Sequence, residues 1–246
     1  MVSGIHVGCA GWSIPAGDRN AFGEGESALA RYATRFTCTE INSSFYRPHR
    51  PATYARWAAA VPAGFLFSVK VPKTISHDAG LRGTGPLLDR FLAEAGQLGD
   101  RLGALLLQLP PGLVFEARVA TTFFAMLRRR TDTAVACEPR HASWFTPAAE
   151  DALRRHAIAR VAADPARHPA GVVPAAAEQC AYWRWHGSPR IYYSAYEPCA
   201  LAALAAQVQA AHRPAHTAWV IFDNTAHGKA TGNALHLQRL LENDHA

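Results

Sequence analysis

The sequence predicts a (β/α)8 TIM barrel formed by a single domain over residues 1–246. Eight short apolar segments recur about 23 to 38 residues apart, and nearly every interval contains a stretch with helical spacing of apolar residues. The length of 246 residues matches the roughly 250 residues typical of this barrel. A doubly wound open sheet is the alternative, but its usual nucleotide signatures, G-x-G-x-x-G and G-x-x-x-x-G-K-[ST], do not occur in the sequence.

The first half of the chain alternates strands and helices. Residues 5–9 form a short apolar strand, and residues 27–36 carry apolar side chains at i, i+3, i+4 and i+7, the spacing of a buried helix face. Side chains of different size and polarity alternate in the strands 37–42 and 65–71, so each strand has a bulky face and a small or polar face. Further helices are expected at residues 51–61 and 86–99.

The second half continues the alternation with one weaker interval. Residues 103–109 are almost entirely apolar, which indicates a strand covered on both faces. Thr146-Pro147 is a helix start, with a capping hydroxyl and proline at the first helical position. Residues 166–179 are rich in turn-forming residues and predict no helix. The remaining elements are expected as strands at 134–138, 158–163, 181–186 and 218–222, and as helices at 117–130, 147–156, 199–212 and 233–241.

Composition favours a globular protein of the cytoplasm. Hydrophobic residues make up 49% of the chain, but no window approaches the roughly 20 apolar residues of a membrane-spanning helix. The segment Met1 to Trp12 lacks the basic and apolar regions of a secretory signal. The five cysteines contain no C-x-x-C pair, so we interpret them as small buried hydrophobes.

The formal net charge of +6 comes mostly from arginine, because Lys70, Lys73 and Lys229 are the only lysines. The single basic run, Arg128 to Arg130, falls at the end of an expected helix, where cations are favoured. The charge is therefore a weak indication of nucleic-acid binding. The three lysines all lie at or just beyond the ends of expected strands.

Polar side chains stand at the carboxyl ends of most expected strands. If the faces with smaller residues point inward, these side chains converge at the C-terminal mouth, where barrel enzymes place their chemistry. They are Glu40, Asn42, Lys70, Gln108, Glu138, Arg140, Asp164, Arg184, His186, Asp223 and Asn224.

The fifth strand contributes the densest segment, E-P-R-H-A-S-W, which runs from Glu138 to Trp144 and also supplies His141. Trp12, Tyr46 and Trp144 are expected to line the walls of the mouth. The carboxylates and the cations Lys70, Arg140 and Arg184 nearly balance, so buried charges can pair. This balance argues against a dedicated metal cage. A divalent metal on Glu138, Asp164, His186 and Asp223 is nevertheless the alternative, and no other cofactor is predicted.

The loops after the seventh and eighth strands predict an anion site. His186-Gly187-Ser188 and His227-Gly228-Lys229 combine glycines, a lysine and the start of a helix, whose free N–H groups attract phosphate. An ordinary glycine-rich turn before the last helix is the alternative.

These motifs together resemble the family called domain of unknown function 72, or YecE-like. The resemblance spans nearly the whole chain and implies a TIM barrel without an established reaction. Asp223 stands where the family usually has an amide, which argues against a metal-ligand role for this residue. The motifs are G-x-x-G-W at 8–12, E-I-N-S-S-F-Y at 40–46, K-V-P-K-T-I-S-H at 70–77, Q-L-P-P at 108–111, E-P-R-H-x-S-W at 138–144, R-W-H-G at 184–187 and G-x-A-x-x-N-A at 228–234.

The leading hypothesis is an enzyme acting on a small polar anion, such as a sugar phosphate, with Glu40 or Glu138 exchanging protons. Two alternatives remain: a nucleic-acid-binding or phosphodiester-cleaving barrel resembling endonuclease IV, and a non-catalytic ligand-binding barrel. The oligomeric state is not predicted. The expected catalytic residues are Glu40, Lys70, Glu138, Arg140, Asp164 and His186, and the expected substrate-binding residues are Trp12, Asn42, Tyr46, Gln108, His141, Trp144, Arg184, Asn224 and Lys229.

Overall fold

The computed structural model describes residues 4–175, 177, 180–213 and 216–243, and it has the mixed α/β fold with parallel strands that the sequence predicts. The strands are β1 (Ile5–Cys9), β2 (Cys38–Ile41), β3 (Leu66–Lys70), β4 (Leu102–Gln108), β5 (Ala134–Glu138), β6 (Ile158–Arg160), β7 (Ala162–Asp164), β8 (Cys180–Trp185) and β9 (Thr217–Phe222). The helices are α1 (Ala28–Tyr32), α2 (Pro51–Ala59), α3 (Gly85–Ala95), α4 (Ala117–Arg128), α5 (Pro147–Arg155), α6 (Pro198–Ala211) and α7 (Lys229–Asn243).

Backbone pairing divides the strands between two sheets, where the sequence predicts one closed barrel. Their orders are β2-β3-β4-β5-β6 and β1-β9-β8-β7. The expected sixth strand is interrupted at Val161, because the backbone of the preceding Arg160 pairs in antiparallel fashion with Ala175. At the other junction, an isolated parallel bridge joins Ala10 to Glu40, and the Gly11 amide donates to the Glu40 carbonyl at 2.8 Å.

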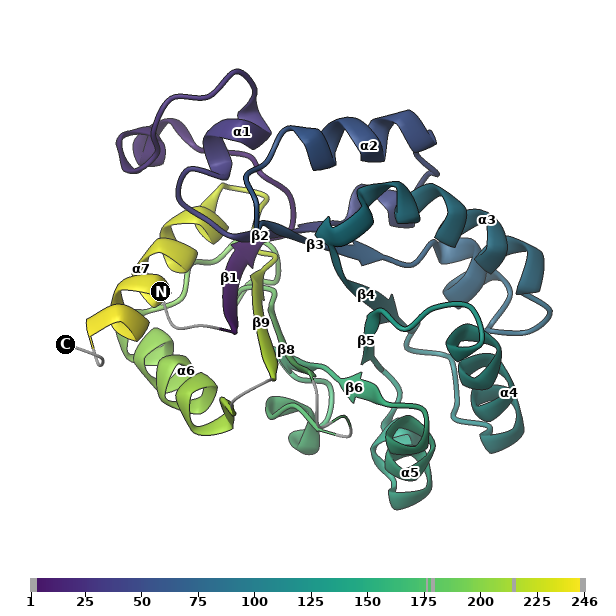
Figure 1. The fold of residues 1–246 in the computed structure, drawn as a ribbon. Helices are drawn as coiled ribbons and strands as arrows, with labels where there is room; N and C mark the ends of the chain where they lie inside the picture. The colour runs from purple at the N-terminus through teal and green to yellow at the C-terminus, as the bar shows by residue number, and fades with distance from the viewer. Residues whose placement is uncertain (1–3, 176, 178–179, 214–215, 244–246) are drawn as a thin grey trace.

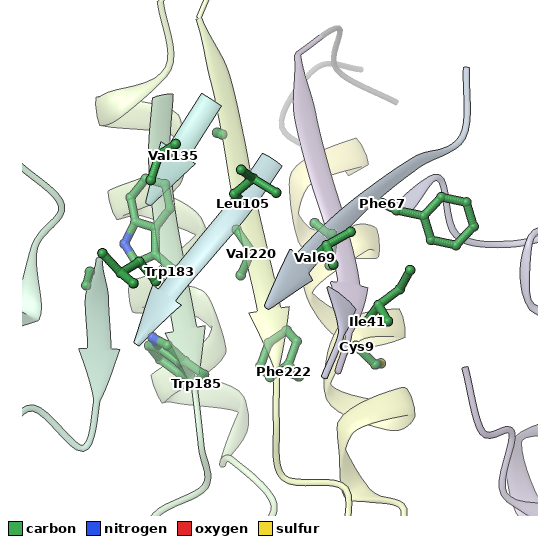
Figure 2. Close-up of a cluster of buried hydrophobic side chains, with 14 of the residues drawn as sticks. Cys9, Ile41, Phe67, Val69, Leu105, Val135, Trp183, Trp185, Val220 and Phe222 are labelled. Atoms are coloured by element: carbon green, nitrogen blue, oxygen red, sulfur yellow. The ribbon is translucent and has the colours of Figure 1, made fainter. Parts of the chain in front are cut away.

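The helices cover the outer faces of both sheets and follow one another around them in chain order (Figure 1). The bulky strand face predicted from the sequence packs against these helices. Phe67 and Val69 of β3 and Trp183 of β8 belong to this outer core (Figure 2). Helix residues such as Leu88 and Phe123 belong to the same core. The alternate positions of each strand must therefore face the space between the sheets.

Smaller side chains fill that inner space. Ala104 and Leu106 of β4 and Ala136 of β5 pack there against the rings of Tyr182 and Trp219. The two rings are stacked with their centroids 6.1 Å apart. Beyond this apolar layer, towards the carboxyl ends of the strands, the inward positions become polar, and these positions form the candidate site.

Several boundaries differ from the expected ones. The helix predicted at 233–241 begins at Lys229, and the helix predicted at 27–36 is confined to α1. Within residues 166–179, a short 3-10 turn covers Pro169–Val172, while residues 176, 178 and 179 lie outside the described part of the chain. Among the helices that the structure describes, none combines the length and apolar character needed to span a membrane.

Candidate active site

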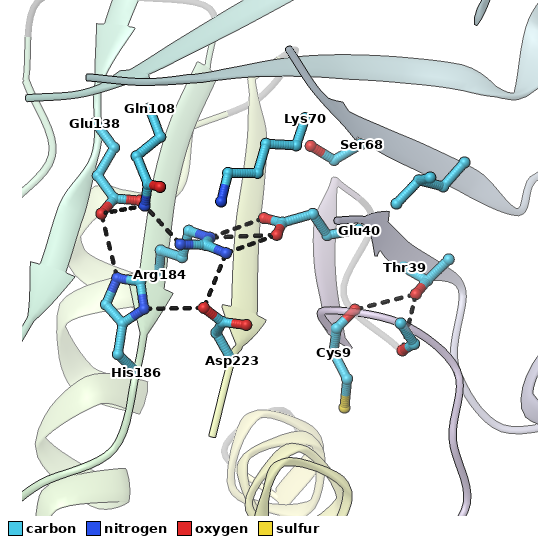
Figure 3. A network of polar contacts seen from close by, with 12 residues as sticks. Cys9, Thr39, Glu40, Ser68, Lys70, Gln108, Glu138, Arg184, His186 and Asp223 are labelled. Carbon is cyan, nitrogen blue, oxygen red and sulfur yellow. Dashed lines mark hydrogen bonds and ion pairs between the residues drawn. The ribbon is translucent and has the colours of Figure 1, made fainter. Parts of the chain in front are cut away.

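The carboxyl ends of strands from both sheets bring a set of charged and polar side chains together (Figure 3). Parallel strands end at the same side of a sheet, so residues distant in sequence meet there. Every member has an exposed fraction of 6% or less. We call this set the Arg184 cluster; it consists of Glu40 (β2), Lys70 (β3), Gln108 (β4), Glu138 (β5), Arg184 (β8), His186 directly after β8, and Asp223 directly after β9.

Arg184 lies at the centre of the cluster and is fully buried. Its guanidinium contacts Glu40 through Nε at 3.0 Å and Nη2 at 2.8 Å, and Glu138 through Nη1 at 3.1 Å. Nη2 also lies 2.9 Å from an Asp223 oxygen. Burial opposes the charge, but the carboxylates of Asp223, Glu40 and Glu138 hold the Arg184 pKa well above its usual range. Arg184 is thus a permanent cation that fixes the positions of three carboxylates.

Glu138 accepts hydrogen bonds on both oxygens. Oε1 accepts from Gln108 at 3.1 Å and from the Arg140 Nη2 at 3.0 Å, while Oε2 accepts from Arg184. Burial alone would raise the Glu138 pKa, but His186, Arg184 and Arg140 lower it well below its ordinary value. A carboxylate with so low a pKa is a weak base at neutral pH.

His186 is held by a carboxylate on each side. Its Nδ1 lies 3.0 Å from Asp223 Oδ2, and its Nε2 lies 3.3 Å from Glu138 Oε1. The Nε2 contact is close but poorly aligned, so this buried nitrogen has no good hydrogen bond within the described part of the protein. Burial disfavours the imidazolium, yet Glu138 and Asp223 raise the His186 pKa above its ordinary value of 6.5. The imidazolium form of His186 is therefore more favoured than that of a histidine in water.

Lys70 has no ion pair within the residues that the structure describes. Its ammonium instead lies 4.2 Å from the centre of the Phe45 ring, and the side chain points into the cluster (Figure 3). Burial and the neighbouring Arg184 lower the Lys70 pKa to about 8, although Glu40, Glu138 and Asp223 act in the opposite direction.

The donor set fits paired ions better than a metal ion. Within the described residues, no group of three or more His, Cys, Asp and Glu side chains is arranged to hold a metal. Glu138 and Asp223 direct oxygens towards Arg184, whose positive charge would repel a cation beside them. Asp164, the fourth candidate ligand, points to Tyr196 instead, with its Oδ1 accepting from that hydroxyl at 2.8 Å.

A cavity of about 240 Å³ opens beside the cluster. Glu138, Arg140 and His186 line it on the cluster side, and Arg167 and Tyr192 contribute further polar groups. Tyr192 has a positive φ of 71° and its ring packs edge-on against His186, with centroids 5.9 Å apart. Such a backbone angle in a non-glycine residue is typical of a functional loop.

Two predicted site residues, Asp164 and Asn224, lie outside the cluster and form hydrogen bonds to the loop after β8. Asp164 accepts from the Tyr196 hydroxyl, and the Asn224 amide donates to Ser194 at 2.9 Å and to Asn233 at 2.8 Å. Asn233 in turn accepts from the Tyr196 backbone at 3.1 Å. These contacts favour a supporting role for both residues.

The expected aromatic walls are dispersed. Trp144 is 1% exposed, belongs to the outer core, and donates from Nε1 to the Leu113 carbonyl at 2.8 Å. Trp12 packs edge-on against Trp57, with centroids 5.1 Å apart. Tyr46 is 69% exposed and lines a different, shallow pocket beside Phe45.

The remaining predicted residues occupy local structural positions. His141 caps the short turn Ala142–Phe145 by accepting from the Ser143 amide. Asn42 precedes the turn Ser43–Phe45, and its buried Oδ1 has no hydrogen-bond partner among the described residues. Lys229 is exposed at the first position of α7.

Sequence reasoning missed two members of the polar network. The Tyr182 hydroxyl donates to Glu40 at 3.1 Å and also lies 2.9 Å from the Ser68 hydroxyl. Both residues stand two positions before a cluster residue on the same strand, Arg184 and Lys70 respectively. That spacing places them on the inward face and could have identified them.

The parallel strands and the buried ion pairs at their carboxyl ends place this chain in the class of α/β proteins. Its candidate active site lies at those strand ends. Over residues 6–246, the chain matches the model of the family described as "Protein of unknown function DUF72". It belongs to this family, as its motifs indicate.

Named relatives agree with this assignment. The chain is 37% identical to the UPF0759 protein YecE of Escherichia coli strain K12 over 106 residues, which are 43% of this chain and 38% of that protein. The aligned part is thus well under half of this relative's length. The YecE protein of E. coli O157:H7 gives the same values.

Solved structures of two DUF72 family proteins show the same fold. The protein from Enterococcus faecalis V583 has a TM-score of 0.79 at 22% identity, covering 97% of this chain and 95% of its own. The protein from Thermotoga maritima MSB8 has a TM-score of 0.78 at 24% identity, covering 97% and 99%. At these identities the likeness concerns the fold alone.

Proposed function

We propose that the protein is an enzyme that binds a small polar anion beside the Arg184 cluster and transfers protons with His186. The observation that carries this proposal is the environment of His186 Nε2. Asp223 holds the other ring nitrogen, while Nε2 is buried without a well-aligned hydrogen bond in a residue that lines the cavity. An imidazole that is oriented through one nitrogen, and whose other nitrogen makes only a 3.3 Å contact with Glu138, fits the role of a general acid or base.

The cations around the cavity favour an anionic ligand. Arg140, Arg167 and His186 line it, and Glu138 is the only carboxylate among its lining residues within the described chain. That carboxylate is already paired with Arg140 and Arg184. The volume of about 240 Å³ is below the roughly 300–1,000 Å³ of pockets for drug-sized ligands, which indicates a small metabolite.

The carboxylates take a different role from the one expected from the sequence. Because the Glu138 pKa is well below its ordinary value, Glu138 is better suited to orient Arg140 and stabilise the imidazolium than to accept protons. Glu40 is completely buried and receives two guanidinium nitrogens and a tyrosine hydroxyl. We assign both residues the role of fixed negative charges.

We also propose that the two sheets act as one (β/α)8 barrel within a single cytoplasmic domain. The Ala10–Glu40 bridge supports contact at one junction. At the other junction, only Val161 separates the end of β6 from the start of β7, which keeps the two sheets adjacent there. In that arrangement the Arg184 cluster stands at the C-terminal mouth, the usual place of barrel active sites.

Ligand-induced thermal stabilisation tests the proposed function. Wild-type protein is titrated with inorganic phosphate and with a panel of small phosphorylated and carboxylated metabolites. We expect at least one anion to raise the melting temperature in wild type and in the control His156→Gln, whose histidine follows α5. The shift should be lost in His186→Gln. A shift of equal size in His186→Gln, or none in wild type, would contradict the proposal.

A turnover assay on the stabilising ligand then separates binding from catalysis. Asp223→Asn keeps a hydrogen-bonding group beside Nδ1 but removes the charge that favours the imidazolium. We expect kcat to fall about 10²-fold or more, with a smaller change in KM, as for loss of acid–base assistance. Unchanged kcat in both Asp223→Asn and His186→Gln would remove the proton-transfer role.

A further inference from the structure

The geometry points to Lys70 as an amine nucleophile that forms an imine with a carbonyl group of the substrate. This inference rests on the proposed function and makes it more specific, because it names the substrate class as a small anion that carries an aldehyde or ketone. Neither the family description nor the names of the relatives assign a role to this lysine.

The contacts of Lys70 differ from those of a structural lysine. A buried ammonium normally pairs with a carboxylate, because an unpaired buried charge is costly. Glu40, Glu138 and Asp223 belong to the same cluster, yet they form their ion pairs with Arg184, Arg140 and His186. Among the described residues, Lys70 pairs with none of them, and its Nζ lies 4.2 Å from the centre of the Phe45 ring.

Lys73 provides a comparison three residues further along the chain. Its side chain is 48% exposed, and its Nζ lies 3.8 Å from Asp78. It has the solvent and the partner expected of a lysine that serves as a surface charge. Lys70, with an exposed fraction of 4%, has neither.

This environment produces the uncharged amine that attacks a carbonyl. With the pKa lowered from 10.5 to about 8, about one Lys70 amine in ten is neutral at pH 7, against fewer than about one in 1,000 at the ordinary value. Desolvation of this kind is how lysines that form Schiff bases are activated.

The reaction balances with groups that the cluster supplies. The neutral Nζ attacks the carbonyl carbon as the C=O π bond breaks, and one proton passes from the nitrogen to the oxygen to give a neutral carbinolamine. The C–O bond then breaks with a proton from the His186 imidazolium, which releases water and leaves a protonated C=N bond to Lys70. The imine thus gains the single positive charge that His186 gives up. The total charge beside Glu40, Glu138 and Asp223 is therefore the same before the attack and after the loss of water.

Reductive trapping tests the inference, and the chain suits it because it contains only three lysines. Wild-type protein is incubated with sodium cyanoborohydride and either pyruvate or dihydroxyacetone phosphate, and modified peptides are located by mass spectrometry. We expect at least tenfold more adduct at Lys70 than at Lys73 or Lys229. The variant Lys73→Arg/Lys229→Arg should retain the adduct, and Lys70→Arg should lose it. Adduct spread evenly over the lysines, or found only at Lys73 and Lys229, would overturn the inference.

The thermal-shift experiment on the same preparation separates the two proposals. If phosphate or another anion stabilises wild type through His186 but neither carbonyl probe labels Lys70, the imine role is overturned and the proposed function stands. If neither stabilisation nor labelling occurs, both are overturned. Labelling at Lys70 that phosphate suppresses supports both.

Discussion

Arg184 and Arg160 are both buried arginines on inner strands, but their surroundings differ. Arg160 of β6 is 3% exposed; it donates to Glu150 and, at 2.7 Å, to the Ala170 carbonyl, and it lies 5.1 Å from the Phe145 ring. It therefore has one carboxylate for one positive charge. Arg184 contacts three carboxylates, of which Glu138 also contacts Arg140 and His186, and Asp223 also contacts His186.

This difference indicates that Arg160 has a structural role, whereas the Arg184 cluster has a functional one. Arg160 fastens the segment after β7 to α5, and its partner Glu150 is 20% exposed, so water screens the pair. The Arg184 cluster concentrates charge in side chains that are at most 6% exposed, an arrangement that costs stability if Arg184 loses its carboxylates or they lose Arg184. Such an arrangement is expected where fixed charges have to act on a ligand.

Replacing Arg184 should have the largest effect. In Arg184→Met, the buried Glu40, Glu138 and Asp223 lose their shared cation, and we expect the free energy of unfolding at pH 7 to fall by about 3–5 kcal/mol. Urea denaturation followed by circular dichroism measures this loss. Arg184→Lys should lose less of the unfolding free energy than Arg184→Met, because lysine keeps the positive charge but not the bidentate geometry of arginine. A loss below about 1 kcal/mol would show that the cluster is not tightly coupled.

Replacing Lys70 should change stability in the opposite direction. Folding lowers the Lys70 pKa to about 8, so keeping this group protonated in the folded state costs free energy. That cost is full below pH 8 and disappears above the unfolded pKa of about 10.5. We expect Lys70→Met to be more stable than wild type at pH 7, by at most about 3 kcal/mol, with the gain fading as the pH rises towards 10. Lys73→Met, at an exposed position, is the matched control. Destabilisation by Lys70→Met at pH 7 would show that Lys70 serves the fold.

Replacing Arg160 should cost less than replacing Arg184 and should spare ligand binding. Arg160→Met removes charge-assisted hydrogen bonds, worth about 1.5–3 kcal/mol, but leaves Glu150 able to turn to water. Chemical denaturation gives the stability, and the anion-induced thermal shift gives the binding. If Arg160→Met abolished the thermal shift while remaining folded, Arg160 would also serve ligand binding, and the distinction between a structural Arg160 and a functional Arg184 cluster would be wrong.

His186 should give the smallest effect, visible as a dependence on pH. Folding raises the His186 pKa, so its contribution to stability is fully present below the unfolded value of 6.5 and is lost as the pH rises through the folded value. The difference in unfolding free energy between wild type and His186→Gln should therefore be larger at pH 6 than at pH 9. Each tenfold increase in proton affinity on folding adds about 1.4 kcal/mol. A difference that is equal at both pH values would contradict the raised pKa.

The sequence predicted most strands and most of the cluster because both follow from alternation. Side chains two residues apart share a face, so Lys70, Glu138 and Arg184 could be assigned to one inward ring before their contacts were known. The partners could not be assigned, because they depend on how the sheets approach one another. Arg184 pairs with Glu40, 144 residues away, and no local pattern encodes that distance.

The sixth strand shows where alternation failed. The sequence interpretation placed Asp164 on the inward face, but Val161 belongs to the inner core and Ala162, two residues before Asp164, to the outer core. Asp164 therefore follows the outer register and meets Tyr196. The antiparallel pairing of Arg160 with Ala175 at this point involves residues far outside the strand. Trp144 was expected to line the mouth, but its ring lies in the outer core. Its indole N–H donates to a backbone carbonyl there, a contact that the sequence pattern does not predict.

The pairing of Glu40 with Arg184 has a consequence for how the chain assembles. Glu40 lies in one sheet and Arg184 in the other, so the site does not exist until both sheets are in place. During synthesis, Glu40 and Glu138 emerge well before Arg184, and burying them without their cation is unfavourable. Contacts between residues this far apart in sequence also carry a large loop-closure cost. We therefore expect the ion pairs of the pocket to form late in folding, after β8 joins the other strands.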